Sequence, residues 1–362
     1  MQHKTNRRVK MLTAIVIPLA LITAACGSSA PNGQGGSTVG TVKHQTIGYI
    51  DIVAAGGMQI RWYNFLTAAA DKLGWDVKLV DAGGVATKAL QGMQRFVSEG
   101  VSAIVVSCVD TGPLMPGLRA AKAANIPVIA LGCAVPEPVD AWDAVYAEQE
   151  QPLAEALSAY LVTELKKQDC NKVSVLQDRT ILVGRQRSDF FISALKKANF
   201  DVVSTPVIPE TSIVPSTQTA VSATLAADPA TCAFVPIFDF SVGATVAQLK
   251  SLGKADSVSV YSYYADNVNL PLLLEPKSSL KGVVDGPVEQ VSLVAISELL
   301  NHFQTGDKID RNAADNLKID FNVITAANAP KNIPNYITPW DTNEYLAPFI
   351  SEWNKKYGLS LK

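Results

Sequence analysis

Residues 101–133 constrain the fold of this chain more than any other stretch. Val101–Ser107 is a short apolar run rich in β-branched residues, and Pro127–Leu131 is a second apolar run. Between them, Leu114–Ala124 carries Ala, Leu, Arg and Lys, which favour a helix. Two apolar strands joined by a helical crossover pair in parallel and are buried on both faces. One such unit cannot form a core alone, so we expect the pattern to continue on both sides.

The alternation of strand and helix continues in both directions. It predicts strands at Ile47–Ile50, Asp76–Val80, Asp143–Ala147, Lys172–Leu176, Asp201–Ser204, Cys232–Phe238, Ser257–Tyr261, Gly282–Val284 and Lys318–Ile324, with helices between most of them. A final amphipathic helix is predicted at Asn343–Tyr357. This order predicts an α/β fold with two doubly wound parallel-sheet lobes. Ligands of such sheets bind outside the carboxyl ends of the strands.

The N-terminus has the pattern of an export signal. The first ten residues carry four basic residues and no acid, and Met11–Ala25 is an apolar run too short to span a bilayer. Thr23-Ala24-Ala25-Cys26-Gly27 looks like a bacterial lipobox, so residues 1–25 are predicted to be a signal peptide and Cys26 a lipidated cysteine. An ordinary cleaved signal is the alternative. Residues 26–45 then read as the anchor and a flexible tether.

Composition and charge exclude several classes of function. Hydrophobic residues make up 48% of the chain, which predicts a globular core. Without residues 1–25, 27 Lys and Arg residues stand against 33 Asp and Glu residues, and this net charge of −6 argues against binding to nucleic acid. The chain has three histidines and no CxxC pair or Cys/His cluster. We therefore expect no metal, no cofactor and no catalytic residue.

Several segments, in order, carry a family resemblance: IGYI, EGVSAIVVSCVDTGPLMPGLRAAKAANIPVIALG, RTILVGRQRSDFFISALKKANFDVV, FVPIFDFSVGATVAQLKSLGK and LKGVVDGPVEQVSLVAISELL. With them the chain from about Thr46 to Ile324 resembles a type I periplasmic binding protein of the ribose-binding-like class, the solute receptors of sugar ABC importers. The resemblance implies an N-terminal lobe (46–138 and 286–319) and a C-terminal lobe (139–285 and 320–362). It also implies three chain crossings, near Ala134–Asp143, Tyr264–Asp285 and Asp320–Asn322.

The resemblance also implies a function. We expect a monomeric lipoprotein at the outer face of the bacterial cytoplasmic membrane, with a small sugar or polyol as ligand and an ABC permease as partner. A sensory receptor for a small sugar-like signal, such as a furanose autoinducer, is the alternative. An enzyme, such as a cell-envelope hydrolase, would need a nucleophile or base in a cleft, and no GxSxG motif is present.

Sugar recognition requires polar groups for the hydroxyls and flat apolar rings for the C–H faces. The strand ends and the resemblance together single out eight candidate ligand-binding residues: Asp51, Trp62, Tyr63, Asp110, Arg185, Asp239, Tyr264 and Asp285. Each has a structural alternative, such as a turn or helix cap for the aspartates and a core position for Trp62.

Arg185, in GRQRSDFF, matches the ligand-contacting arginine of the family, and we interpret Arg187 as structural. A surface salt bridge is the alternative for Arg185. Asp239 corresponds to a hydroxyl-binding Asn or Asp, and Asp285 to a polar hinge residue. Trp62 and Tyr63 lie where the family places ring-stacking aromatics, although MQIRWYNF replaces the usual Asn-Pro-Phe-Phe.

One departure from the family bears on the ligand. After the strand Pro127–Leu131, sugar binders generally carry Asp-Arg, which grips hydroxyls, whereas this chain has Gly132-Cys133-Ala134. The geometry of ligand binding must therefore differ from that of ribose binders, or another carboxylate must compensate.

Four cysteines besides Cys26 lie near strand ends. In the 2-1-3-4-5 sheet order implied by the resemblance, Cys108 and Cys133 follow neighbouring strands, and Cys170 and Cys232 precede neighbouring strands. Neighbouring strands are about 5 Å apart, which suits disulfide geometry. We predict disulfides Cys108–Cys133 and Cys170–Cys232; four buried free cysteines are the alternative.

Overall fold

The computed structural model describes residues 40–330 and 340–362, all within one compact unit. The predicted signal peptide, Cys26 and most of the predicted tether lie outside the described residues. Within them, no helix has both the length and the apolar composition needed to cross a bilayer.

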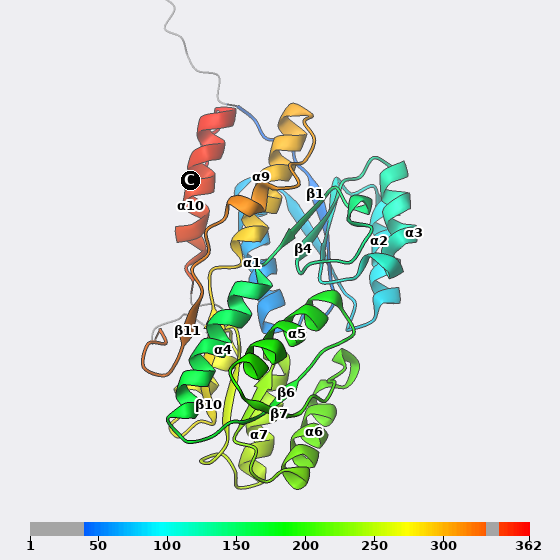
Figure 1. The fold of residues 1–362 in the computed structure, drawn as a ribbon. Helices are drawn as coiled ribbons and strands as arrows, with labels where there is room; N and C mark the ends of the chain where they lie inside the picture. Colours follow the sequence, from blue (N-terminus) through cyan, green and yellow to red (C-terminus); the bar gives the residue numbers. More distant parts are fainter. Residues whose placement is uncertain (1–39, 331–339) are drawn as a thin grey trace, which may run out of the picture. The chain divides into compact units, whose positions relative to one another are not determined.

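The first lobe is built on a five-stranded parallel sheet of order β2-β1-β3-β4-β5 (Figure 1). Its strands are β1 (Thr46–Asp51), β2 (Asp76–Asp81), β3 (Ala103–Ser107), β4 (Val128–Gly132) and β5 (Ala144–Ala147). Helices α1 (Gly57–Lys72) and α9 (Gln290–Thr305) pack together against one face, and α2 (Ala86–Glu99) and α3 (Thr111–Ala123) cover the other. β3 and β4 are buried along their whole length, as parallel strands covered on both faces must be.

The second lobe carries a six-stranded sheet of order β11-β10-β9-β8-β6-β7. Its strands are β6 (Lys172–Leu176), β7 (Asp201–Ser204), β8 (Ala233–Pro236), β9 (Ser259–Tyr263), β10 (Leu280–Asp285) and β11 (Asn322–Ile324). Among the described strands of this sheet, β11 alone is antiparallel to its neighbour. Helices α4 (Glu150–Lys166) and α5 (Leu182–Lys197) pack together, as do α6 (Ile213–Ala227) and α7 (Val242–Ser251), while the short α8 (Asn269–Leu274) contacts β10.

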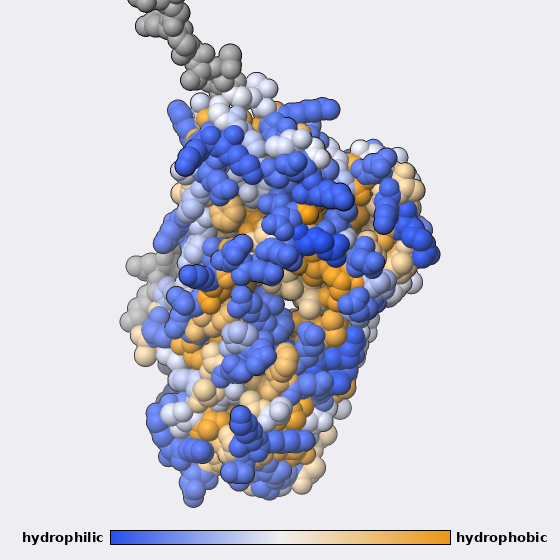
Figure 2. Space-filling model, turned by 45° about the horizontal axis from the view of Figure 1, so that its top comes forward, coloured by the Kyte–Doolittle hydropathy of each residue, from blue (hydrophilic) through white to orange (hydrophobic). Residues whose placement is uncertain are grey.

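The predicted fold class of two parallel-sheet lobes is confirmed, and most elements begin and end within two residues of their predicted positions. The last strand is an exception, since β11 covers only Asn322–Ile324 of the predicted Lys318–Ile324. Polar side chains cover most of the face shown in Figure 2, over both lobes, with smaller groups of apolar residues between them.

The predicted lobe boundary at 138/139 needs correction. Strand β5 pairs with β4 in the first sheet, so the first crossing lies after Ala147 and not within 134–143. Strand β10 belongs to the second sheet up to Asp285, so the second crossing follows that residue, at the predicted lobe boundary 285/286. The third crossing, immediately before Asn322, lies where it was expected.

The C-terminal helix belongs to the first lobe and not to the second. Helix α10 (Thr342–Tyr357) packs against α9 and α1. Trp353, buried on its apolar face, donates a hydrogen bond from Nε1 to Ser297 Oγ of α9 at 2.9 Å. The amphipathic pattern predicted the helix and its buried face, but it could not show which lobe that face would meet.

Each lobe contains one disulfide, and the pairs are those expected from the strand order. Cys108 is bonded to Cys133 with a Cα–Cα distance of 4.8 Å, and Cys170 to Cys232 with 6.4 Å. The first bond joins the residues that follow β3 and β4, at the carboxyl edge of the first sheet.

We predict that non-reducing peptide mapping will recover these two cross-linked pairs. Replacing Cys108 and Cys133 together by Ser should lower the free energy of unfolding by roughly 3 kcal/mol, because the unfolded chain regains the freedom of a closed loop. Denaturant unfolding of the double variant measures the loss. Four free thiols in the oxidised, folded protein would contradict the pairing.

Candidate ligand-binding site

The carboxyl ends of the strands of the two lobes face each other, and two carboxylates link the lobes there. Asp239, after β8, accepts a hydrogen bond at 3.1 Å from Met58 N in the first turn of α1. In return, Asp110 of the first lobe accepts one at 3.1 Å from Leu182 N, the first residue of α5. Each lobe therefore caps a helix of the other lobe.

This exchange of caps explains two aspartates that were predicted either to bind ligand or to cap their own helices. Asp110 makes no side-chain cap on α3, although it lies at its N-cap position. The N-cap residues of α1 and α5 are Gly56 and Ile181, and neither provides a side-chain cap. The carboxylates of the opposite lobe satisfy N–H groups that a helix start leaves without intrahelical partners.

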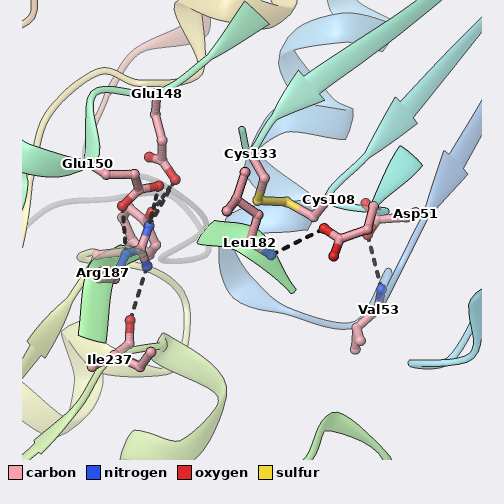
Figure 3. Close-up of a disulfide and its surroundings, with 11 residues drawn as sticks. Asp51, Val53, Cys108, Cys133, Glu148, Glu150, Leu182, Arg187 and Ile237 are labelled. Atoms are coloured by element: carbon pink, nitrogen blue, oxygen red, sulfur yellow. Dashed lines mark hydrogen bonds and ion pairs between the residues drawn. A yellow bond between two sulfur atoms is a disulfide. The ribbon is translucent and has the colours of Figure 1, made fainter. Parts of the chain in front are cut away.

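Arg187 of α5 lies at the centre of a cluster of polar groups that includes Glu148 and Glu150 (Figure 3). Its side chain is fully buried and donates hydrogen bonds to Glu150 at 2.7 and 2.9 Å, to Glu148 at 3.1 Å and to the Ile237 carbonyl at 3.0 Å. Tyr264 bonds to both Arg187 and Glu148. Glu148 and Glu150 lie at the first crossing between β5 and α4, so Arg187 links α5 of the second lobe to that crossing.

Aromatic rings surround the same guanidinium group. The centroids of Tyr263, Phe238 and Tyr264 lie 4.3, 4.8 and 5.3 Å from Arg187 Cζ. These contacts add cation–π attraction in a site without water exposure. Burial and the charge of Glu150 raise the pKa of Glu148 well above its ordinary value. Arg187 is thus the shared ion-pair partner of Glu148 and Glu150.

The structure places the two arginines of GRQRSDFF on different faces of α5. Arg185, predicted to contact ligand, is partly exposed at the rim, where it pairs with Asp110 at 3.3 Å and bonds to the carbonyls of Arg179 and Thr180. Arg187, interpreted as structural, is the buried one. A sequence signal was available, because Val183, Arg187 and Phe191 lie four residues apart on the buried face of α5.

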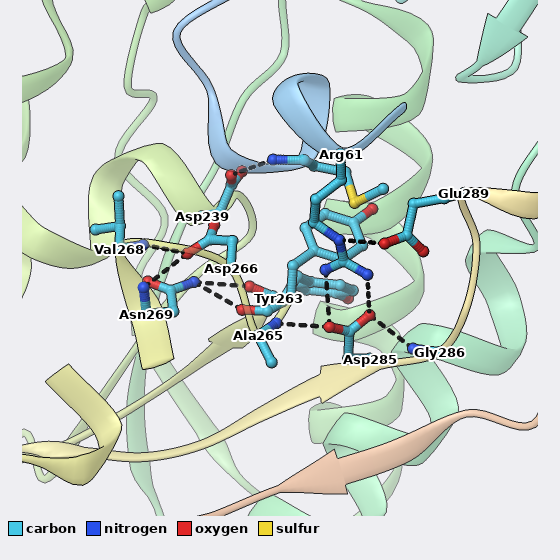
Figure 4. A network of polar contacts seen from close by, with 12 residues as sticks. Arg61, Asp239, Tyr263, Ala265, Asp266, Val268, Asn269, Asp285, Gly286 and Glu289 are labelled. Carbon is cyan, nitrogen blue, oxygen red and sulfur yellow. Dashed lines mark hydrogen bonds and ion pairs between the residues drawn. The ribbon is translucent and has the colours of Figure 1, made fainter. Parts of the chain in front are cut away.

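A second buried arginine holds the second crossing (Figure 4). Arg61 of α1 bonds to both oxygens of Asp285 at 2.8 and 3.1 Å and to Glu289 at 2.6 Å, and all three side chains are fully buried. Asp285 also accepts hydrogen bonds from Ala265 N and Gly286 N. Both oxygens of Asp285, which was predicted to contact ligand, therefore already accept hydrogen bonds from groups at the second crossing.

Two carboxyl groups of the second lobe lie together near the start of α1 (Figure 4). Asp266 accepts hydrogen bonds from Val268 N and Asn269 N and so caps α8. Burial raises the pKa of Asp266 well above its ordinary value, and the charge of Asp239 raises it further. A Cβ atom on Gly57 would come within 2.2 Å of Asp266, so glycine is required where α1 approaches this pair.

A third acidic group spans the two lobes. It consists of Asp51 at the end of β1, Asp110 after β3, and Asp178 and Glu210 after β6 and β7. Burial raises the pKa of Glu210 to about 8, with contributions from the charges of Asp178, Asp51 and Asp110. Burial also raises the pKa of Asp51 to about 7. We refer to these four residues as the acidic group.

The packing of Trp62 against Gly132 explains why this chain lacks the Asp-Arg that sugar binders carry after β4. Trp62 of α1 is 2% exposed, and its ring lies so close to Gly132 that a Cβ there would come within 2.6 Å of it. Gly132 also has a φ of 78°, which disfavours other residues. The indole therefore occupies the space at the end of β4 that a side chain at position 132 would need. Tyr63, the other aromatic candidate, packs edge-on against Tyr49 at 5.4 Å.

Several buried polar atoms near these strand ends have no hydrogen-bond partner among the described residues. They include Asp51 Oδ2, Trp62 Nε1, Glu148 Oε2, Asp178 Oδ2 and the Tyr263 hydroxyl. A buried polar atom left unpaired costs about 1–3 kcal/mol, and proteins normally avoid it. These atoms come from both lobes, and a polar ligand that reached them would supply the missing partners.

Sequence reasoning missed Arg61, Glu148, Glu150, Asp178 and Glu210. Arg61 carried a detectable signal, since it lies between Met58 and Phe65 on the buried face of α1. The four acidic residues follow strands or begin a helix, but so do many solvent-exposed carboxylates. Their relevance depends on which strand ends meet across the lobes.

Comparison with known proteins agrees with this architecture. Residues 43–306 match the family model described as the periplasmic binding protein domain, so the chain belongs to that family. No match was found among curated proteins.

The chain is similar in structure to a 5-methylthioribose transporter solute-binding protein from Thermotoga lettingae, with a TM-score of 0.68, 17% identity, and coverage of 78% of this chain and 86% of that one. It is also similar to a galactofuranose-binding protein (TM-score 0.69, 17% identity, 87% and 99% covered). A third is a solute-binding protein from Actinobacillus succinogenes with bound D-allose (0.67, 16%, 78% and 98%). At these identities the likeness concerns the fold.

Replacing the two arginines should separate their roles. Arg187→Ala should lower the free energy of unfolding by roughly 3–5 kcal/mol, because it leaves two buried carboxyl groups without their cation. Arg185→Ala should cost under about 1 kcal/mol, since its ion pair is partly exposed. Urea unfolding measures both, and equal losses would contradict the assignment.

The acidic group makes stability depend on pH. The pKa of Glu210 is about 8 in the folded protein, above its ordinary 4.5, so the folded state retains a proton that the unfolded chain loses. This residue therefore destabilises the fold progressively as pH rises from about 4.5 to about 8. Glu210→Gln should raise the melting temperature at pH 8.5 and leave it nearly unchanged at pH 4.5. A difference independent of pH would contradict this prediction.

Proposed function

We propose that the protein is an extracytoplasmic lipoprotein that traps a small sugar or polyol between its two lobes and delivers it to an ABC permease. The observation that carries the proposal is the set of buried, unpaired polar atoms at the facing strand ends. Family membership supports the same role, because the similar structures include proteins with 5-methylthioribose and D-allose bound. Binding without turnover, a monomeric state and a lipid anchor at Cys26 are part of the proposal.

The contacts follow from chemistry and position. Trp62 offers a large ring and an unpaired N–H, and Tyr263 an unpaired hydroxyl, both suited to a sugar ring and its substituents. Asp51 and Asp178 offer carboxylate oxygens from opposite lobes. Arg187 and Asp285, whose hydrogen bonds are already made within the protein, act by holding the hinge in position. Asp110, Asp239 and Tyr264 hold the lobes together, Arg185 lies at the rim, and Tyr63 supports the site through Tyr49.

Ligand-dependent melting against pentoses, hexoses, polyols and amino acids tests the proposal. A true ligand at a hundredfold excess over its dissociation constant should stabilise the protein by roughly 3 kcal/mol. A panel in which no sugar or polyol stabilises the protein would contradict the function. Consumption of the ligand by the pure protein would contradict binding without turnover.

Two tyrosines of β9 provide a matched pair of variants. Tyr263→Phe removes the unpaired hydroxyl and should weaken ligand binding by roughly fivefold to tenfold, as for one lost hydrogen bond. Tyr261→Phe removes a hydroxyl of the same strand that packs near Tyr160, away from the strand ends, and should leave affinity unchanged. Equal affinities for both variants would exclude Tyr263 from the site.

A further inference from the structure

The facing strand ends are strongly acidic, because every arginine there is already paired within the protein. Arg187 is shared by Glu148 and Glu150, Arg61 by Asp285 and Glu289, and Arg185 pairs with Asp110. Arg179 turns outward to Asp189. No basic residue is paired with the remaining carboxyl groups of the described site, which are Asp51, Asp178, Glu210, Asp239 and Asp266.

Within the acidic group, the two lobes place carboxyl groups opposite one another. The start of α2 brings Gly84 close to Glu210 of the other lobe, with 3.2 Å between a Cβ built on Gly84 and the Cβ of Glu210. Asp110 reaches across to Leu182 N and Arg185. The charges of Asp51 and Asp110 from one lobe and of Asp178 from the other all act on Glu210.

Two oxygens of this group are buried without a partner. Asp51 and Asp178 are each 1% exposed. One oxygen of each is held, Asp51 Oδ1 by Val53 N and Asp178 Oδ1 by the backbone and hydroxyl of Thr180. Oδ2 of Asp178 has no hydrogen-bond partner among the described residues, and Oδ2 of Asp51 has none of normal geometry, with the Tyr49 hydroxyl beside it. A carboxylate fixed through one oxygen, with the other buried and unpaired, is arranged to accept from a donor that enters the site.

We propose that the ligand carries a protonated amine, which binds between Asp51 Oδ2 of the first lobe and Asp178 Oδ2 of the second, with Glu210 beside it. This inference rests on the proposed function and narrows its ligand class from sugars and polyols to amino sugars and amino polyols. Hydrogen bonds from an ammonium group to carboxylates are among the strong ones, and burial strengthens them. A metal ion is less suited, because the described residues form no group of ligands that could hold one.

A neutral sugar would leave the charge repulsion within the acidic group uncompensated. With all four carboxyl groups ionised, Arg185 is the one ion-pair partner that they have among the described residues. Protonating some of them relieves the repulsion, which agrees with the raised pKa values of Asp51 and Glu210, at about 7 and about 8. An ammonium group removes the need for those protons by supplying the missing positive charge.

Matched pairs of compounds test the proposal by isothermal titration and melting at pH 7. The pairs are D-glucosamine with D-glucose, D-galactosamine with D-galactose, and 1-amino-1-deoxy-D-sorbitol with D-sorbitol. For at least one pair the amine should bind tenfold or more tightly than its hydroxyl counterpart. N-acetyl-D-glucosamine, which keeps the nitrogen without the charge, should lose that advantage.

Proton release gives a second readout that needs no variant. The titratable or charged groups that face the amine position are Tyr49, Asp51, Asp81, Asp110, Asp178, Arg185 and Glu210. Of these, Asp51 and Glu210 are partly protonated at pH 7 and should lose protons when the amine binds. Titrations in buffers of different ionisation enthalpy should therefore show proton release to the buffer with the amine and not with the neutral partner.

Variants locate the effect. Asp178→Asn should abolish most of the preference for the amine while retaining the shape of the site. Asp189→Asn removes an equal charge from an exposed position on α5 of the same lobe and should leave the preference unchanged. An equal loss in both variants would show a general charge effect and overturn the assignment to the acidic group.

The outcomes separate this inference from the proposed function. If neutral sugars or polyols bind as tightly as their amines in every pair, the amine inference is wrong and the proposed function stands. If no member of the pairs binds and the wider panel also fails, the proposed function is lost and the inference with it. If only amino acids bind, the cationic group is not carried by a sugar or polyol, and both statements are overturned.

Discussion

The structure depends on two buried arginines that each hold a chain crossing between the lobes. Arg187 reaches from the second lobe to Glu148 and Glu150, and Arg61 reaches from the first lobe to Asp285 and Glu289. A buried charge is tolerated only when it is paired and fully hydrogen-bonded. The hinge geometry is therefore specified by ionic contacts on both sides, and the strand ends that it aligns form the candidate site.

Reciprocal helix capping, like the buried arginines, holds the two lobes together. Asp110 and Asp239 each satisfy an N–H group in the first turn of a helix in the opposite lobe. These bonds form only when the lobes are together, so they favour the closed arrangement by roughly 1 kcal/mol each. The crowding of carboxyl groups around Glu210 opposes closure, and a ligand that relieves it would shift the balance.

Much of the fold could be predicted from the sequence, because hydrophobic periodicity is a local property. The run Val101–Leu131 already required a buried parallel sheet, and the strand order then placed the cysteines in the pairs observed. The site was less accessible to prediction. Arg185 and Arg187 differ in which face of α5 they occupy. The family motif gave them different roles, but only the spacing Val183, Arg187, Phe191 indicates that Arg187 is the buried one.

The sequence by itself determined the α/β class, the two lobes and the acidic balance of the chain, and the strand order implied by the family resemblance added the cysteine pairs. Only the tertiary structure decided which charges are paired, that α10 packs on the first lobe, and that Trp62 fills the space beside Gly132. The physical reason is range. Secondary structure and burial follow from neighbours along the chain, whereas the electrostatics of the site depend on side chains such as Asp51 and Glu210, which are 159 positions apart and meet only across the lobes.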